Sequence, residues 1–366
     1  MTIKRFAGAW LAVLGLAAAS SAALAQSKEV RVYNWSDYID EQTIKDFEAE
    51  TGIKVTYDVF DQNEILETKL LAGKSGYDVV VPSATFLARQ IKAGVFQKLD
   101  KSKIPNLKYA WPEIYQRLAT YDPGNEYAVN YMWGTTGIGY NVNKVKKALD
   151  GDAPDSWAFV YDPENLKKLK SCGVMFLDSA EDLLPSVMTY LGLKPEWTED
   201  NINKAAAHLS KLKPYVTQYN STEYISGLAK GSICVAVGYS GDVYQAKSRA
   251  EEAKNKVEVD YMLPKEGAQL WFDEMVIPAD APHPDAAHAF IDYMQKPEVA
   301  AKNSNFVSYA NGNLESQKFI DESVKGNPNV YPTPDVFAKL FTVETITDSK
   351  IQRTLTRAFQ KAKSGR

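Results

Sequence analysis

Short runs of β-branched and aromatic residues alternate with helical patterns near the start of the chain. The runs at 30–33, 54–60 and 78–81 have the length and composition of strands. Between them, residues 41–51 and 64–72 place apolar side chains at helical spacing. This β-α-β-α-β order predicts an open α/β sheet.

A second α/β unit is expected from about residue 135. Residues 128–133 are typical of a strand, and the glycine-rich stretch at 134–140 is interpreted as a crossing. Further strands are predicted at 174–177, 233–237, 257–263 and 269–278, and a helix at 284–295. Because no long flexible linker separates the units, we expect two lobes joined by short crossings, with a cleft between them.

The lobes are expected to exchange segments of the chain. We assign residues 26–134 and about 255–308 to the first lobe, and residues 135–254 and about 309–366 to the second.

The first 25 residues have the pattern of a cleaved secretory signal peptide. Lys4 and Arg5 precede an apolar stretch at 7–16, and Ala23-Leu24-Ala25 forms a small-x-small cleavage site. The alternative is an N-terminal membrane anchor, but the apolar stretch ends at Ser20-Ser21 without a second apolar segment. We therefore predict that the protein is exported.

Composition narrows the function classes. The 366 residues carry 42 Lys and Arg against 46 Asp and Glu, a formal net charge of −4, which disfavours a nucleic-acid partner. The two cysteines, Cys172 and Cys234, are predicted to form a disulfide in an oxidising compartment. With 3 His and 2 Cys, the chain lacks the sequence pattern of a metal site, and none of its possible cofactor-binding motifs is complete. We therefore expect neither a bound metal nor a cofactor.

Aromatic residues recur beside carboxylates close to the predicted strands. The positions are Trp35 to Tyr38 after the first strand, Asp178 and Glu181 after the strand at 174–177, Tyr239 and Asp242 after the strand at 233–237, and Trp271 with Asp273. Ligands of open α/β sheets bind at strand ends, where aromatic faces and carboxylates together suit an organic cation. Taken singly, each residue also fits a helix cap or a core position.

Four segments closely resemble the periplasmic polyamine-binding proteins of bacterial ABC importers. They are VYNWSDYI at 32–39, YDVVVPS at 77–83, NYMWGTTGIGYN at 130–141 and GYSGD at 238–242. The resemblance covers essentially the whole mature chain. It implies two hinged α/β lobes that close on putrescine or spermidine, a membrane permease as partner, and a monomer without enzymatic activity. By position, the ligand-binding residues would be Trp35, Ser36, Asp37, Tyr38, Ser83, Asp178, Glu181, Tyr239, Asp242, Trp271, Asp273 and Tyr309. Whether Ser83 contacts ligand or only caps the helix after it stays open.

Two positions bear on which polyamine is preferred. Putrescine-type relatives have Trp where this chain has Tyr239 and Phe where it has Trp271. Spermidine-type relatives have a Trp two residues before an Asp, as in Trp271 and Asp273, and an acidic pair three residues apart, as in Asp178 and Glu181. The resemblance therefore favours spermidine, because additional carboxylates can neutralise a third ammonium.

Other functions remain open at this stage. A putrescine-preferring binder, a binder of cadaverine or agmatine, and a sensor subunit all fit the same residues. A periplasmic hydrolase is a different class, in which Asp178 and Glu181, or Asp242 and Asp273, would act as an acid/base pair.

Overall fold

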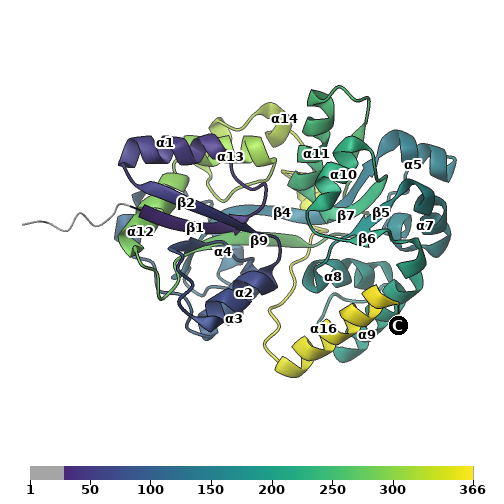
Figure 1. Ribbon diagram of the computed structural model, residues 1–366, viewed down its shortest axis with the longest axis horizontal. Helices are drawn as coiled ribbons and strands as arrows, with labels where there is room; N and C mark the ends of the chain where they lie inside the picture. Colours follow the sequence, from purple (N-terminus) through teal and green to yellow (C-terminus); the bar gives the residue numbers. More distant parts are fainter. Residues whose placement is uncertain (1–28, 366) are drawn as a thin grey trace, which may run out of the picture.

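The computed structural model describes residues 29–365 and has two lobes that share a nine-stranded sheet (Figure 1). The strand order is β2-β1-β3-β9-β4-β7-β5-β6, and β8 pairs with β4. The strands are β1 (Glu29–Trp35), β2 (Lys54–Phe60), β3 (Val79–Val80), β4 (Ala128–Asn141), β5 (Val174–Phe176), β6 (Gln218–Tyr219), β7 (Val235–Tyr239), β8 (Val259–Met262) and β9 (Leu270–Val276). The predicted two-lobed α/β class is confirmed.

The first lobe contains the predicted β-α-β-α-β unit, in which β1 pairs in parallel with both β2 and β3. Its first helix begins at an N-cap, where the Asp40 carboxylate accepts from the Gln42 amide, and ends at Gly52 in the left-handed conformation. The helices of this lobe are α1 (Glu41–Thr51), α2 (Asn63–Ala72), α3 (Ala84–Lys92), α4 (Pro112–Leu118), α12 (Pro284–Met294), α13 (Pro297–Val307), α14 (Glu322–Lys325) and α15 (Pro334–Phe337).

Strand β4 belongs to both lobes. Its first half pairs with β9 in the first lobe, and its second half pairs with β7 and β8 in the second lobe. The glycine-rich stretch predicted as a separate crossing is therefore the continuation of one strand. Gly134 allows close packing there, because an added Cβ would lie 2.6 Å from the Trp271 ring.

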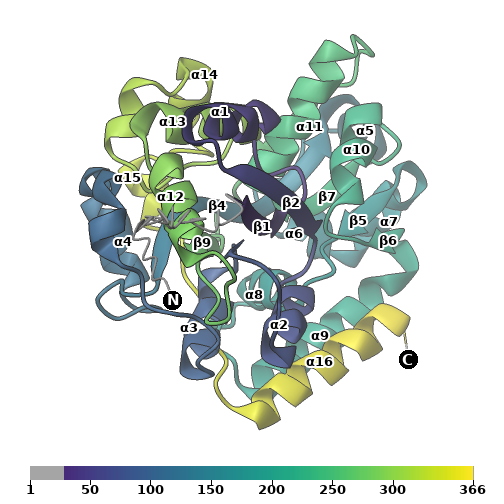
Figure 2. The ribbon, with the colours of Figure 1, turned by 60° about the vertical axis from the view of Figure 1, so that its left-hand side comes forward.

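The second lobe has its own apolar core, which includes Ile138, Phe176 and Leu228. Its helices are α5 (Val142–Leu149), α6 (Ala158–Tyr161), α7 (Pro163–Leu169), α8 (Ala180–Tyr190), α9 (Glu199–Leu212), α10 (Glu223–Lys230), α11 (Ser240–Glu252) and α16 (Ser349–Ser364). The C-terminal helix α16 lies along α9 at the edge of this lobe (Figure 2).

The packing divides the two exchanged segments differently from the sequence-based assignment. In the segment at 309–366, Ile320 and Val330 pack with Ile114 of the first lobe, whereas α16 packs on the second. In the segment at 255–308, β8 pairs with the second-lobe end of β4. We propose that the first lobe begins again near β9, and that the chain returns to the second lobe just before α16.

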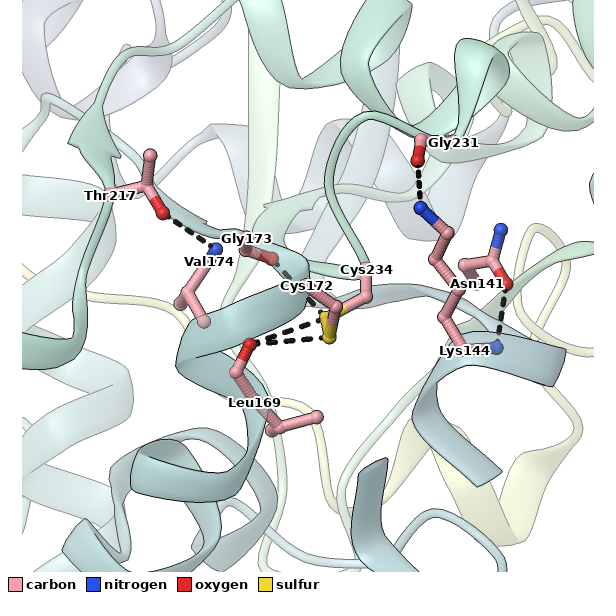
Figure 3. The surroundings of a disulfide bond; sticks show 9 residues. All are labelled: Asn141, Lys144, Leu169, Cys172, Gly173, Val174, Thr217, Gly231 and Cys234. Carbon is pink, nitrogen blue, oxygen red and sulfur yellow. Dashed lines mark hydrogen bonds between the residues drawn. A yellow bond between two sulfur atoms is a disulfide. The ribbon is translucent and has the colours of Figure 1, made fainter. Parts of the chain in front are cut away.

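The predicted disulfide between Cys172 and Cys234 is confirmed (Figure 3). It joins the turn after α7 to the residue before β7, with the two Cα atoms 5.4 Å apart. Both sulfur atoms lie near the Leu169 carbonyl, at the edge of the second-lobe core. The bridge therefore ties a helix end to a central strand of that lobe.

Two expectations concern the N-terminus and membranes. The predicted signal peptide at 1–25 lies outside the described residues. Between residues 29 and 365, no helix combines the length and apolar character needed to cross a bilayer.

Candidate functional site

A pocket lies in the cleft, with walls from both lobes. The space between its walls is about 530 Å³, which includes open solvent at the mouth. The first-lobe lining consists of Trp35, Ser36, Tyr38, Phe60, Asp61, Ser83, Trp271, Asp273 and Tyr309. The second-lobe lining consists of Asp182, Ser221, Thr222, Ile225, Tyr239 and Asp242. Four of these fifteen side chains are carboxylates, and none of the fifteen is Lys, Arg or His.

Asp273 is the buried carboxylate of the first-lobe wall. It lies on β9, and its two oxygens accept hydrogen bonds from Ser83 Oγ at 2.7 Å and from Tyr38 Oη at 2.9 Å. Burial raises the pKa of Asp273 to about 7, although both hydroxyl donors favour the ionised form. The carboxylate is thus fixed in position, and its negative charge is only partly compensated.

Ser83 occupies the N-cap position of α3, as predicted, but its side chain makes no capping hydrogen bond. Its hydroxyl instead donates to Asp273 and accepts from the Asn63 amide at 3.0 Å. Ser83 therefore holds a pocket carboxylate in position.

Asp242 is the corresponding carboxylate of the second lobe, in the first turn of α11. It accepts from Tyr224 Oη and Tyr309 Oη, each at 2.7 Å. Burial raises the pKa of Asp242 to about 6, whereas the two phenols lower it. Because Tyr309 packs in a first-lobe cluster, its bond to Asp242 links the two lobes beside the pocket.

A third buried carboxylate, Asp182 of α8, was missed by the sequence analysis. It accepts from Tyr239 Oη at 2.9 Å, and burial raises its pKa. Its position could have identified it, because Asp182 lies in the first turn of a helix that follows a strand. It is adjacent to Glu181, which was predicted to bind ligand instead. Phe60 and Asp61 were also missed, although they are an aromatic residue beside a carboxylate at the end of the predicted strand 54–60. Ser221, Thr222 and Ile225 were missed because no aromatic-carboxylate pattern marks them.

Aromatic rings form the remaining walls. Trp271 makes edge contacts with Tyr239 and Tyr309, at ring-centre distances of 5.6 and 5.3 Å. The Trp35 indole nitrogen donates to the Val81 carbonyl at 2.9 Å, which fixes that ring relative to β3. Rigid aromatic faces beside carboxylates suit a cation with an apolar body.

Three of the twelve residues predicted to bind ligand are directed elsewhere. Asp37 has a left-handed backbone conformation, with φ of 55°, and its half-exposed carboxylate pairs with Arg249 at 2.6 Å. Asp178 pairs with Lys363 of α16, and Glu181 pairs with Arg89 of α3 at 2.9 Å. None of the three lines the pocket. The structure brings the other nine together, and their contact with ligand stays a prediction.

Metal binding has no structural counterpart in the described part of the chain. There, no three or more His, Cys, Asp or Glu side chains are grouped in a way that would hold an ion. The pocket carboxylates are instead bonded to tyrosine and serine hydroxyls.

Comparison with known proteins identifies the family. Over 367 residues, covering all of both chains, the protein is 53% identical to the putrescine-binding periplasmic protein SpuD of Pseudomonas aeruginosa. It is 52% identical to the putrescine-binding periplasmic protein PotF of Escherichia coli, over 93% of each chain. A Listeria monocytogenes structure described as a spermidine/putrescine ABC transporter superposes with a TM-score of 0.83, at 32% identity, over 93% of this chain and 100% of that one. Residues 42–333 match the model for bacterial extracellular solute-binding proteins, and the chain belongs to that family.

Proposed function

We propose that the protein is the polyamine-binding component of an ABC importer, and that it takes the diamine putrescine in the cleft. The observation that carries this proposal is the pocket lining, which has buried carboxylates from both lobes and no basic side chain among its fifteen residues. Such a lining favours an organic dication, because each ammonium gains charge-assisted hydrogen bonds and the aromatic walls cover the methylene chain.

The choice of putrescine corrects the preference for spermidine drawn from Trp271 and the acidic pair. The two relatives at 53% and 52% identity are both described as putrescine-binding proteins. The argument from the acidic pair is also weakened, since Asp178 and Glu181 are paired with Lys363 and Arg89. A third ammonium therefore lacks the carboxylates that were expected to receive it.

Ligand binding in this proposal is coupled to closure of the lobes. Asp273 belongs to the first lobe, and Asp182 and Asp242 belong to the second. A dication that contacts carboxylates of both lobes binds the closed state better than the open one, and this difference in affinity shifts the population toward closure. The closed form would then be recognised by the membrane permease. The periplasmic location and the monomeric state stay predictions.

A hydrolase is disfavoured by the same geometry. Asp178 and Glu181 lie outside the pocket lining, and Asp242 and Asp273 are each held by two hydroxyl donors. The family is one of solute-binding proteins. A sensor that reports ligand to a signalling partner would use the same pocket, so the binding proposal holds for it as well.

Calorimetric titration of the refolded mature protein tests the proposal. We expect tight 1:1 binding of putrescine, weaker binding of spermidine, and no measurable binding of γ-aminobutyrate, which has the same chain length but carries a carboxylate at one end. Absence of putrescine binding would refute the proposal. Tighter binding of spermidine would refute the diamine preference but retain the polyamine class.

Binding is expected to weaken as the pH falls. The ligand ammonium groups stay charged below about pH 10, whereas the carboxyls of Asp242 and Asp273 have raised pKa values of about 6 and 7 and take up protons on acidification. Both carboxylates must be ionised to pair with the ligand, so affinity should fall by at least about tenfold between pH 8 and pH 5. Titrations at pH 6 in buffers of different ionisation enthalpy should also detect proton release on binding. A flat pH profile would contradict the assigned carboxylates.

The same pKa shifts predict the opposite trend for the ligand-free protein. Because the folded-state pKa values lie above those of an unfolded aspartate, protonation stabilises the folded state at low pH, and this contribution is lost as the pH rises through 6 to 7. Added putrescine should therefore raise the midpoint of thermal unfolding more at pH 8 than at pH 5.

A further inference from the structure

Arg89 connects the lobes just outside the pocket. It lies on α3 of the first lobe, and its guanidinium binds Glu67 of α2 through Nε at 2.6 Å and Nη2 at 3.2 Å. Its Nη1 donates to Glu181 Oε1 of α8, in the second lobe, at 2.9 Å. The guanidinium also lies 3.6 Å from the centre of the Phe86 ring. Arg89 is therefore fixed by four side-chain contacts at the junction of the lobes.

Arg89 faces an excess of negative charge. Glu181 is only 2% exposed, and within residues 29–365 its second oxygen, Oε2, has no hydrogen-bond partner. Glu64 lies close enough that the charges of Glu181 and Asp182 add to the effect of burial, which raises the pKa of Glu64 to about 7. The next residue after Glu181 is Asp182, which lines the pocket. Glu181 therefore lies within reach of the charge of Asp182, beside the pocket wall, and there the positive charge is supplied by the protein.

We propose that Arg89 is a specificity-determining residue, whose guanidinium takes the place beside Glu181 that the third ammonium of a triamine would otherwise occupy. This inference rests on the proposed function and extends it to the basis of the diamine preference. With Arg89 in place, Glu67 and Glu181 are already paired with its guanidinium, so a third ammonium would have to displace that cation to reach Glu181. A buried ammonium without a partner is strongly disfavoured.

Removal of Arg89 should open this position to a ligand. The variant Arg89→Gln leaves Glu67 and Glu181 without their shared cation and creates space where the guanidinium lay. Spermidine can then supply the missing charge with its third ammonium, whereas putrescine cannot. Lys363, which neutralises Asp178, provides a second internal cation on the same lobe as Glu181.

The test is the ratio of spermidine to putrescine affinity, measured by calorimetry for the wild type and Arg89→Gln. We expect the ratio to shift toward spermidine by about tenfold or more, the size of one charge-assisted contact. Arg89→Lys keeps the charge and should retain a ratio close to that of the wild type. The double variant Arg89→Gln/Glu181→Gln lacks the vacated carboxylate and should lose the shift.

Arg249→Gln is the matched control, because it also removes an ion pair between the lobes, that with Asp37, but lies away from Glu181. It should weaken both ligands by similar factors and leave the ratio unchanged. An unchanged ratio in Arg89→Gln, or an equal shift in Arg249→Gln, would overturn the role of Arg89 while leaving putrescine binding by the wild type intact. If Arg89→Gln fails to fold, an increased ratio in Lys363→Gln, which leaves Arg89 and Glu181 paired, would likewise overturn it. Failure of the wild type to bind any polyamine would overturn both proposals.

Discussion

Asp273→Asn is expected to weaken putrescine binding by about 2–5 kcal/mol, because a desolvated ammonium loses its charged partner. Asp242→Asn should have an effect of similar size from the opposite lobe. Asparagine has nearly the same shape and can still accept a hydrogen bond from one of the hydroxyls that now bind each carboxylate. Calorimetry at pH 8 measures the loss directly.

The ligand-free stability of these variants separates a binding defect from a folding defect. Burial raises the pKa of both carboxyls, so ionisation at pH 8 opposes folding in the absence of ligand. The asparagine variants should therefore unfold at the same temperature as the wild type or a higher one. Asp37→Asn is the control, since its exposed pair with Arg249 contributes about 0–1 kcal/mol. Putrescine affinity within threefold of the wild type in Asp273→Asn would contradict the site.

Loss of the disulfide is the second large effect. The two cysteines are separated by 62 residues, and closing a loop of that length restricts the unfolded chain by about 4 kcal/mol in the chain-entropy model. The double variant Cys172→Ala/Cys234→Ala should lose about this much free energy of unfolding, measured with urea. Alanine avoids placing a new polar group at the buried position of Cys234.

A chemical control accompanies the disulfide variant. Dithiothreitol should destabilise the wild type to a similar extent and leave the double variant unaffected. Putrescine affinity should be unchanged where the variant is folded, because neither cysteine lines the pocket. A loss below about 1 kcal/mol would show that the bridge does not limit the unfolded chain as the loop-length model requires.

Local pattern was sufficient to predict much of the fold. The ranges predicted for α1 and β2 coincide with the observed ones, and those of α2 and α12 differ by one residue. These elements have regular periodicity and clear ends, such as Asp40 before α1 and Gly52 after it. The continuity of β4 was not predicted, because glycines at 134, 137 and 139 resemble a loop in sequence. They are accommodated in the strand because Trp271, Tyr261 and Val243 fill the space beside them.

The candidate site shows the same contrast between local and distant information. Trp35, Asp242 and Asp273 lie at positions where local sequence marks both the strand and the chemistry. Glu181 and Asp182 are adjacent in one helix turn, and only the structure shows that Asp182 faces the pocket whereas Glu181 meets Arg89, 92 residues away in sequence. Asp178 is likewise neutralised by Lys363, 185 residues away. No local sequence pattern indicates which carboxylates will form ion pairs with cations so distant in the chain.

A crystal structure of the protein with putrescine tests the central claim most directly. We predict a single diamine in the cleft, with its ammonium groups within hydrogen-bond distance of Asp273 on one lobe and of Asp242 or Asp182 on the other, and with its methylene chain against the aromatic walls. The contact between Arg89 and Glu181 should persist. A diamine bound outside the cleft, or one that contacts carboxylates of a single lobe, would contradict the account.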